Sequence, residues 1–378
     1  MEVQAISGLT TFEIISIFSK LIPNENHKKA LMLWGLTGTG KSQIQRQILK
    51  GLASGKTWTP AAGVIPSGAL EVIGEWGLVD LRTSLLEPTD LRGLPDLKGN
   101  TVRWLAPEEL PLIGQEARFP SKGVLFLDEI NHAQPAMQSA CFSLVLDRRC
   151  GPHQLMPGWK LVAASNFSSE NAHTHMMSDP LRNRFEHYHL RCSLDAFKQW
   201  ALTTGINPKV VAFLNWNPDF LHKPTEVQEE SFPTPRAWAD ASQAMEIFTN
   251  GDLPHVLTAH LGAGAAEIFN GFLRIFGDSD LSIDLLAVLK GKEKAPKLTT
   301  KKPDIAWAFT ARLAGYVKEN PKLLSPALEF LCSNTWKDAV EIGKTGISDL
   351  KYIVGNEAFL SAVRVHQAEI QKLYGSLA

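Results

Sequence analysis

The residues whose types and spacing could do chemistry begin with a glycine-rich loop. Residues 35–42 read GLTGTGKS, the G-x-x-x-x-G-K-[ST] pattern of a phosphate-binding loop. Glycines let the backbone curl so that successive N–H groups point at phosphate oxygens. Lys41 can reach the terminal phosphates, and the Ser42 hydroxyl can ligate Mg²⁺. We expect contacts to a nucleoside triphosphate from Gly35, Leu36, Thr37, Gly38, Thr39, Gly40, Lys41, Ser42 and Gln43.

A pair of acidic residues follows the third of the apolar runs in the first half. Residues 123–129 read GVLFLDE, a short apolar stretch that ends in Asp128 and Glu129. A buried parallel strand would deliver both carboxylates to its carboxyl end, where open α/β sheets bind ligands. Asp128 suits a position at Mg²⁺, directly or through water, and Glu129 suits the polarisation of an attacking water.

The elements that must position these residues alternate between strands and helices. Nearly continuous apolar runs predict strands that are covered on both faces, as in a parallel sheet. Four such runs are 30–34, 77–81, 124–127 and 161–164, and a fifth strand is expected at 185–190. Helical periodicity at 42–52 and 135–147 fills two of the gaps, with Pro135 suited to a first turn. The alternation predicts an α/β layer fold.

The second half of the chain has a helical pattern. Helices are predicted at 196–202, 208–214, 236–248, 305–317 and 356–373. A lysine-rich segment, 290–302, interrupts them with little apolar content. It is typical of a solvated loop, and the alternative is a contact to an acidic partner or a nucleic-acid backbone.

Composition excludes several classes of protein. The 378 residues are 44% hydrophobic and 20% charged, which is globular rather than disordered, and the net charge of −1 gives no global field for nucleic acid. No apolar run reaches the roughly 18 residues of a membrane-spanning helix. No basic residue precedes Lys20, so a signal peptide is not expected. Four scattered cysteines favour reduced thiols, and we expect a cytoplasmic protein without a membrane partner.

These motifs together resemble the AAA+ ATPases, and specifically their MoxR-like branch. Residues 128–140, DEINHAQPAMQSA, are similar to the extended Walker B segment of that branch, although His132 stands where arginine is usual. Asn166 matches the sensor 1 polar residue. Residues 181–185, LRNRF, are similar to the element that carries the arginine finger, and Arg236 matches the sensor 2 arginine of the lid.

The resemblance also implies a domain organisation. Residues 83–105 resemble the insertion that these proteins carry on their second helix, with Thr89, Asp90 and Gly93 in its motif. The implied fold is a P-loop NTPase α/β sheet flanked by helices, followed by an α-helical lid and an α-helical C-terminal region. The expected boundaries are 1–193, 194–290 and 291–378. Specific motifs cover about 31–245, and the helical remainder is only weakly similar to the tails of related ATPases.

The resemblance assigns a role to each polar residue. Asn166 would hold the attacking water or the γ-phosphate, and Arg236 would sense the γ-phosphate and couple it to lid rotation. Arg184, which abuts Phe185, is preferred as the arginine finger, with Arg182 as its companion. A finger that acts on the neighbouring subunit implies a closed ring, and the family suggests a hexamer.

Each of these polar residues also has a purely structural interpretation. Arg182 and Arg184 would also suit surface ion pairs, Arg236 an ordinary first helical turn, and Asn166 a turn. The pairs His173/His175 and His187/His189 lack a carboxylate or cysteine to complete a metal site, so metal binding is not favoured.

The expected function is an ATP-hydrolysing ring motor with Mg²⁺ as cofactor. Its remodelling or chaperone-like action would fall on a protein partner through the 83–105 insertion, and the resemblance to the MoxR-like branch implies a partner with a von Willebrand A domain. One alternative is a nucleic-acid motor such as a translocase or a restriction-type enzyme. Another is a structural ring that uses nucleotide as an assembly switch with little turnover. The loop pattern does not distinguish ATP from GTP.

Overall fold

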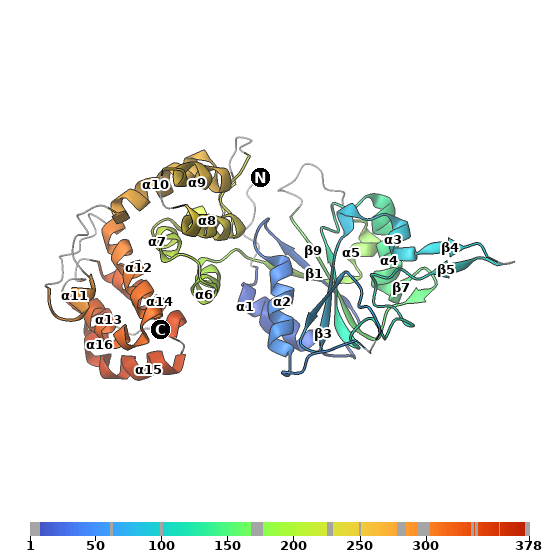
Figure 1. The fold of residues 1–378 in the computed structure, drawn as a ribbon, viewed down its shortest axis with the longest axis horizontal. Coiled ribbons are helices and arrows are strands. Elements are labelled where there is room, and N and C mark those ends of the chain that lie inside the picture. Colours follow the sequence, from blue (N-terminus) through green and yellow to red (C-terminus); the bar gives the residue numbers. More distant parts are fainter. Residues whose placement is uncertain are drawn as a thin grey trace. The chain divides into compact units, whose positions relative to one another are not determined.

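The computed structural model divides the chain into two compact units, Met1–Cys192 and Ser193–Ala378 (Figure 1). It describes residues 8–60, 63–98, 101–167, 177–224, 230–248, 251–277, 285–293, 303–333, 336, 339–354 and 356–374. The first unit is an α/β P-loop fold and the second is helical, as predicted. The further division of the second unit into a lid and a C-terminal extension stays a prediction.

A six-stranded sheet in the order β10-β1-β9-β6-β3-β2 organises the first unit. The strands are β1 (Ala30–Gly35), β2 (Leu70–Ile73), β3 (Trp76–Arg82), β6 (Lys122–Asp128), β9 (Gly158–Ser165) and β10 (Phe185–Leu190). All five predicted strands are present and parallel, and β2 adds an antiparallel edge strand that the sequence did not predict.

Both faces of the sheet are buried, which explains why its strands are almost continuously apolar. On one face, Leu31 and Leu33 join the core formed with α1 (Thr11–Leu21) and α2 (Lys41–Leu52). On the other face, Met32 joins the core formed with α4 (Pro135–Asp147). Successive side chains of a strand point to opposite faces, so a strand between two helical layers needs apolar residues at every position.

Helix α1 was not predicted, although its start carries a recognisable signal. The Thr10 side chain accepts a hydrogen bond from the Glu13 amide, and the Glu13 carboxylate accepts one from the Thr10 amide. This reciprocal cap satisfies two of the free N–H groups at the start of the helix. The inward face of α1 buries Ile14 and Phe18 against the sheet.

The 83–105 segment forms a small structure of its own. A 3₁₀ turn, η1 (Thr83–Leu85), leads into α3 (Pro88–Arg92) and then into a hairpin of β4 (Leu94–Asp96) and β5 (Arg103–Leu105). Gly93 joins helix and hairpin with φ of 85°, and a Cβ there would lie 1.9 Å from the Leu105 carbonyl oxygen. The hairpin projects from the rest of its unit (Figure 1). A second, two-residue hairpin, β7 (Arg149–Cys150) with β8 (His153–Gln154), follows α4.

The described part of the second unit consists of helices. They are α6 (Leu194–Thr204), α7 (Pro208–Trp216), η2 (Pro218–Leu221), α8 (Pro235–Ile247), α9 (Leu253–Leu261), α10 (Ala263–Gly277), α11 (Leu285–Leu289), α12 (Pro303–Glu319), η4 (Pro321–Leu323), α13 (Leu324–Leu331), α14 (Val340–Val354), α15 (Asn356–Val365) and α16 (Gln367–Tyr374).

The helices predicted in this half are present, with one correction. The expected single helix over 356–373 is two helices, α15 and α16, that are separated at His366. The His366 ring contacts the Ser325 hydroxyl at 2.8 Å, which pins the break against α13. Apolar periodicity continues across the break, so the pattern alone did not reveal it. Most of the lysine-rich segment, from residue 294 to 302, lies outside the described residues.

Aromatic side chains form the core of this unit. Phe213 on α7 packs against Trp238, Phe269 and Phe272, with ring centroids 5.3, 5.0 and 5.6 Å away. The Trp238 indole donates to the Phe220 carbonyl at 2.7 Å, so its one polar group is satisfied inside the core. Trp159 and Trp336 are buried like Trp238, so these three tryptophans serve packing.

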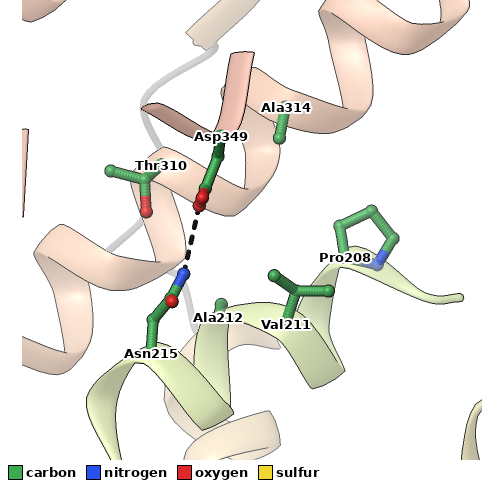
Figure 2. A pocket seen from close by; sticks show the side chains of 7 residues that line it. All are labelled: Pro208, Val211, Ala212, Asn215, Thr310, Ala314 and Asp349. Carbon is green, nitrogen blue, oxygen red and sulfur yellow. Dashed lines mark hydrogen bonds between the residues drawn. The ribbon is translucent and has the colours of Figure 1, made fainter. Parts of the chain in front are cut away.

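A buried ion pair ties three helices of the second unit together. Lys198 on α6 contacts Asp349 on α14 at 2.6 Å, and Asn215 on α7 donates to the same carboxylate at 3.1 Å. Burial raises the pKa of Asp349, and Lys198 counteracts part of that rise. The carboxylate borders a small cavity between α7, α12 and α14, lined mainly by apolar side chains such as Val211 and Ala314 (Figure 2).

None of the described helices is long and apolar enough to span a bilayer. The four cysteines are free thiols. Burial raises the pKa of Cys141 and of Cys150 to about 12, so these two thiols are unreactive at neutral pH.

The packing of the Trp159 ring leaves no room for a larger residue at two neighbouring glycines. The ring lies over Gly77 and Gly123, where an added Cβ would come within 2.5 and 2.8 Å of ring carbons. We expect Gly77→Ala to lower the free energy of unfolding by about 1–3 kcal/mol through overpacking. Urea unfolding of the full chain measures the change. Gly51→Ala, on the exposed face of α2 with open space around it, is the control and should be neutral or stabilising. Equal effects of the two substitutions would contradict the packing argument.

Candidate functional site

The predicted phosphate loop lies between β1 and α2. Gly38 and Gly40 have φ of 73° and 81°, a left-handed conformation that glycine adopts without strain. Gly40 is also the residue that precedes the first turn of α2, and that turn contains no acidic side chain. The positive end of the helix and its free N–H groups therefore face the loop without a competing carboxylate, as an anion site requires.

Lys41 crosses the loop and joins three elements. Its ammonium donates to the Gly35 and Leu36 carbonyls, each at 3.0 Å, and to Asn166 Oδ1 at 2.7 Å. Only 9% of the residue is exposed. Asn166 follows β9, and because β9 pairs directly with β1, the two predicted residues meet although 125 positions separate them. The structure thus brings Lys41 and Asn166 together.

Ser42 and Asp128 also lie side by side. The Ser42 hydroxyl is 3.5 Å from Asp128 Oδ2, and Asp128 Oδ1 accepts from the Glu129 amide at 3.0 Å. Burial raises the pKa of Asp128, while Lys41 and the amide hydrogen bond counteract part of the rise. A hydroxyl and a carboxylate oxygen are hard donors of the kind that Mg²⁺ takes, so this pair fits the predicted metal position.

Glu129 has an unusual backbone and a fixed side chain. Its φ is 57°, one of two positive values at non-glycine residues in the described chain, and such strain is often stored at functional sites. Its Oε2 accepts a hydrogen bond from the Ser84 hydroxyl at 2.7 Å. Thr83 holds the same turn, because its hydroxyl donates to the Asp128 carbonyl at 2.8 Å.

Ser84 and Asn131 are two residues of the site that the sequence did not single out. The Asn131 amide donates to the Asn166 carbonyl at 3.1 Å and so supports the segment that carries Asn166. Asn131 lies within the Walker-like segment, and Ser84 lies in the insertion. The motifs therefore include both residues, but they do not indicate which residue each one contacts.

The three candidate arginines have different surroundings. Arg182, at the end of α5 (Asp179–Arg182), forms an ion pair with Asp179 at 2.6 Å. Arg184 is exposed, and its guanidinium makes no hydrogen bond or ion pair with any residue that the structure describes. Arg236 belongs to the second unit and is exposed in the first turn of α8, where Thr234 caps the helix. The catalytic roles of all three stay predictions.

The histidines that could have formed metal pairs make other contacts. His187 bonds to Trp34 and to the Arg182 carbonyl, and His189 stacks on Phe167 at 5.8 Å. Within the ranges described, no cluster of three or more metal-ligating side chains is present. His173 and His175 lie outside the described residues.

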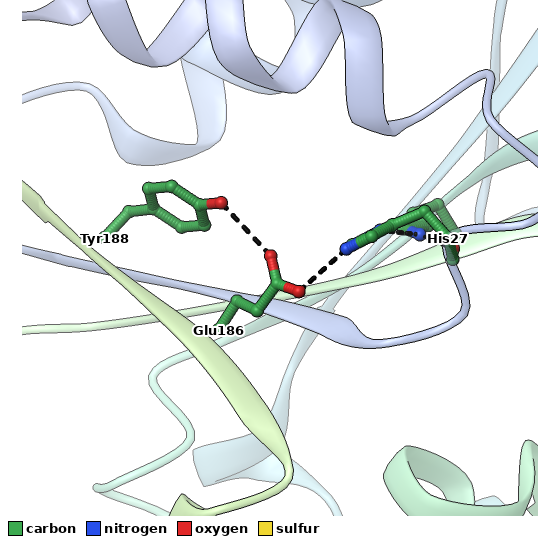
Figure 3. A network of polar contacts seen from close by, with 4 residues as sticks. His27, Glu186 and Tyr188 are labelled. Carbon is green, nitrogen blue, oxygen red and sulfur yellow. Dashed lines mark hydrogen bonds and ion pairs between the residues drawn. The ribbon is translucent and has the colours of Figure 1, made fainter.

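A separate polar cluster lies near the amino ends of β1, β9 and β10. His27 contacts Glu186 Oε1 at 2.8 Å, and the Tyr188 hydroxyl donates to Glu186 Oε2 at 3.1 Å (Figure 3). Lys160 donates to the His27 carbonyl and contacts its ring. Burial, with a smaller effect of Arg148, lowers the pKa of Lys160 to about 8. Since parallel strands carry the phosphate loop at their opposite ends, this cluster is not part of the nucleotide site.

Comparisons with known proteins give distant structural matches. No family model and no curated protein matches the chain. Two crystal structures of NtrX from Brucella abortus, the first in complex with ADP, are 15% and 14% identical and cover 95% and 92% of this chain. The match spans 68% of each NtrX chain, with TM-scores of 0.36 and 0.33. Similarity at this level does not bear on activity, so the function rests on the geometry of the site.

The Lys160 cluster predicts a pH dependence of stability. The folded chain holds the Lys160 proton less tightly than the unfolded chain does, with a pKa of about 8 against the ordinary 10.5. Between these pH values the unfolded state binds more protons, so the free energy of unfolding should rise with pH, by about 1–3 kcal/mol. Urea unfolding at several pH values measures it. Lys160→Met should flatten the rise, and parallel curves for the two proteins would contradict the assignment.

Proposed function

We propose that this chain is an ATP-hydrolysing P-loop motor of the AAA+ type, of the MoxR-like branch that its motifs resemble. One observation carries the proposal: Lys41, Ser42, Asp128 and Asn166 converge at one edge of the sheet although they come from three separate strand ends. A site that only binds phosphate, without hydrolysing it, would need only the loop. The carboxylates and the amide beside it are the additional groups that hydrolysis requires.

Each residue has a defined part in phosphoryl transfer. The loop amides and the positive end of α2 bind the phosphates, and Lys41 neutralises charge on the β- and γ-oxygens. When bound, Mg²⁺ supplies further positive charge at these oxygens, held by Ser42 and Asp128. Glu129 orients the attacking water, and Asn166, already bonded to Lys41, is within reach of the γ-phosphate region.

The arginine finger is assigned to Arg184 rather than to Arg182. Arg182 is engaged by Asp179 at 2.6 Å, whereas Arg184 is exposed without a bonding partner in the described chain. A free guanidinium on the surface is what a neighbouring active site needs. Fingers of this kind contribute roughly 10³–10⁵ in rate. The proposal therefore includes a closed homo-oligomeric ring, six subunits by family resemblance, with Arg236 as the γ-phosphate sensor of the lid.

A protein substrate fits the projecting hairpin better than a nucleic acid does. Its apolar side chains are exposed: Leu94 by 62%, Leu97 by 76%, Val102 by 58% and Leu105 by 56%. Exposed apolar clusters mark protein contacts, while a phosphate backbone is bound by basic side chains. This favours remodelling of a protein partner through the hairpin, and the resemblance suggests a partner with a von Willebrand A domain.

Phosphate release by the purified ring is the direct test. Lys41→Ala should abolish nucleotide binding or turnover, because it removes the ammonium that lies across the loop. Glu129→Gln should bind ATP with near wild-type affinity but hydrolyse it at least 10²-fold more slowly, on the order expected for loss of a general base. Normal turnover by either variant would overturn the site assignment. Negligible turnover by the wild-type ring would instead indicate a nucleotide-switched structural ring.

The Glu129→Gln variant also separates protein from nucleic-acid substrates. An ATP-locked ring should retain its protein partner, and Leu97→Asp in the hairpin should release it without changing ATP binding. Binding of DNA or RNA at low ionic strength, lost as salt increases, would favour the nucleic-acid motor instead. GTP in place of ATP in the same assay tests the choice of base.

The contact between Ser84 and Glu129 yields a further prediction. The Ser84 hydroxyl donates to the carboxylate that must orient water, and so occupies one of its oxygens and turns it toward Ser84. A hydrogen bond to a charged group is worth about 1.5–3 kcal/mol, so Ser84→Ala should raise basal kcat by roughly 10- to 100-fold. Steady-state hydrolysis measures the change, and ATP affinity should not move. A fall in kcat would mean that Ser84 orients Glu129 rather than restraining it.

A further inference from the structure

Two aromatic side chains connect the strand before the phosphate loop to the turn that carries the candidate finger. Trp34 on β1 immediately precedes Gly35, and His187 lies on the neighbouring strand β10. The Trp34 indole N–H donates to His187 Nδ1 at 2.8 Å, and the two rings are nearly parallel, with centroids 6.0 Å apart and an interplanar angle of 20°. His187 Nε2 is 2.8 Å from the Arg182 carbonyl oxygen.

The chemistry of the three groups fixes the direction of both hydrogen bonds. An indole N–H only donates, and a carbonyl oxygen only accepts. His187 must therefore accept at Nδ1 and donate from Nε2, so one tautomer alone makes both bonds. The Arg182 carbonyl lies in the last turn of α5, where helix carbonyls lack a partner within the helix. His187 thus supplies the donor that this carbonyl needs.

Arg184 is rigidly connected to the same turn. The Arg184 amide donates to the Leu181 carbonyl at 3.1 Å, and the side chain of Leu181 is buried, as is that of Phe185, which follows Arg184. The turn therefore has two buried anchors and one polar one, the bond from His187. A shift of the Arg182 carbonyl moves the backbone that carries Arg184, while the guanidinium of Arg184 makes no bond to the residues that the structure describes.

We propose that His187 is a positioning residue that couples the phosphate loop of one subunit to the arginine finger which that subunit offers to its neighbour. The inference rests on the proposed function. His187 touches neither nucleotide nor reacting atoms in it; it holds the backbone of 182–184 in register with Trp34 and hence with Gly35. A change in the loop on nucleotide binding would reach the finger through these two hydrogen bonds.

Three variants separate this role from general packing. His187→Leu keeps an apolar side chain but removes both hydrogen bonds, and a misplacement of about 1 Å at a catalytic group costs on the order of 10²-fold. We expect kcat to fall by roughly 10- to 100-fold with ATP affinity within about twofold of wild type. His187→Gln, whose amide can accept from Trp34 and donate to Arg182, should recover most of the rate. Trp34→Phe removes the indole donor but keeps an aromatic ring and the His187–Arg182 bond, and should give an intermediate loss.

A mixing experiment shows where His187 acts. His187→Leu subunits have an intact pocket and a misplaced finger, whereas Glu129→Gln subunits have a dead pocket and an intact finger. In mixed rings, turnover per His187→Leu subunit should rise above that of pure His187→Leu rings. Arg184→Ala mixed with Glu129→Gln is the reference. Should His187→Leu fail to fold or assemble, as judged by circular dichroism and size, the same mixing with Trp34→Phe decides the outcome.

The outcomes separate this inference from the proposed function. Wild-type kcat in His187→Leu rings, or no rise on mixing where Arg184→Ala does show one, overturns the role of His187 and leaves the motor intact. Normal turnover by Arg184→Ala overturns the finger and this inference together. A slow His187→Leu enzyme that is restored by His187→Gln and rises on mixing supports it.

Discussion

The buried ammonium of Lys41 is the interaction on which the rest of the site depends. A cation that is only 9% exposed must be compensated, and here two loop carbonyls and the Asn166 side chain do so. These contacts connect the loop and the end of β9 to Lys41 at the start of α2. Phosphate oxygens would provide stronger partners for the same ammonium than neutral carbonyls do, so the bound state has a clear electrostatic advantage.

Strand order determines which groups can meet that cation. Because β9 lies between β1 and β6, Asn166 ends up beside Lys41, while Asp128 and Glu129 arrive one strand further along. The next strand, β3, brings Thr83 and Ser84 against the acidic pair. On the opposite side of β1, β10 brings His187 beside Trp34. The carboxyl edge of the sheet therefore carries the binding and hydrolytic groups, and Trp34 with His187 connects that edge to the turn that precedes the amino end of β10.

Local signals in the sequence were sufficient for most of the fold and for the phosphate loop. Residues 35–42 and the strand and helix around them are defined by neighbours in the chain, and so are strands such as β10, whose limits were predicted correctly. Helix α1 carried a Thr10/Glu13 cap that predicts a start. The break at His366 was not predicted, and the Ser325 hydroxyl that contacts the His366 ring lies 41 positions away.

The site residues that the sequence did not predict also have partners that lie far away in the chain. Ser84 is 45 positions from Glu129, and Trp34 is 153 positions from His187, so nothing in either pair's local sequence indicates the other. A serine after a strand or a histidine on an edge strand is common, and only the pairing of strands gives it a partner. Motifs identify groups that bind the ligand, because phosphate chemistry demands particular residue types. Groups that adjust those residues need only one hydrogen bond of the right direction, which many residue types can provide, and they become visible when the strands are assembled.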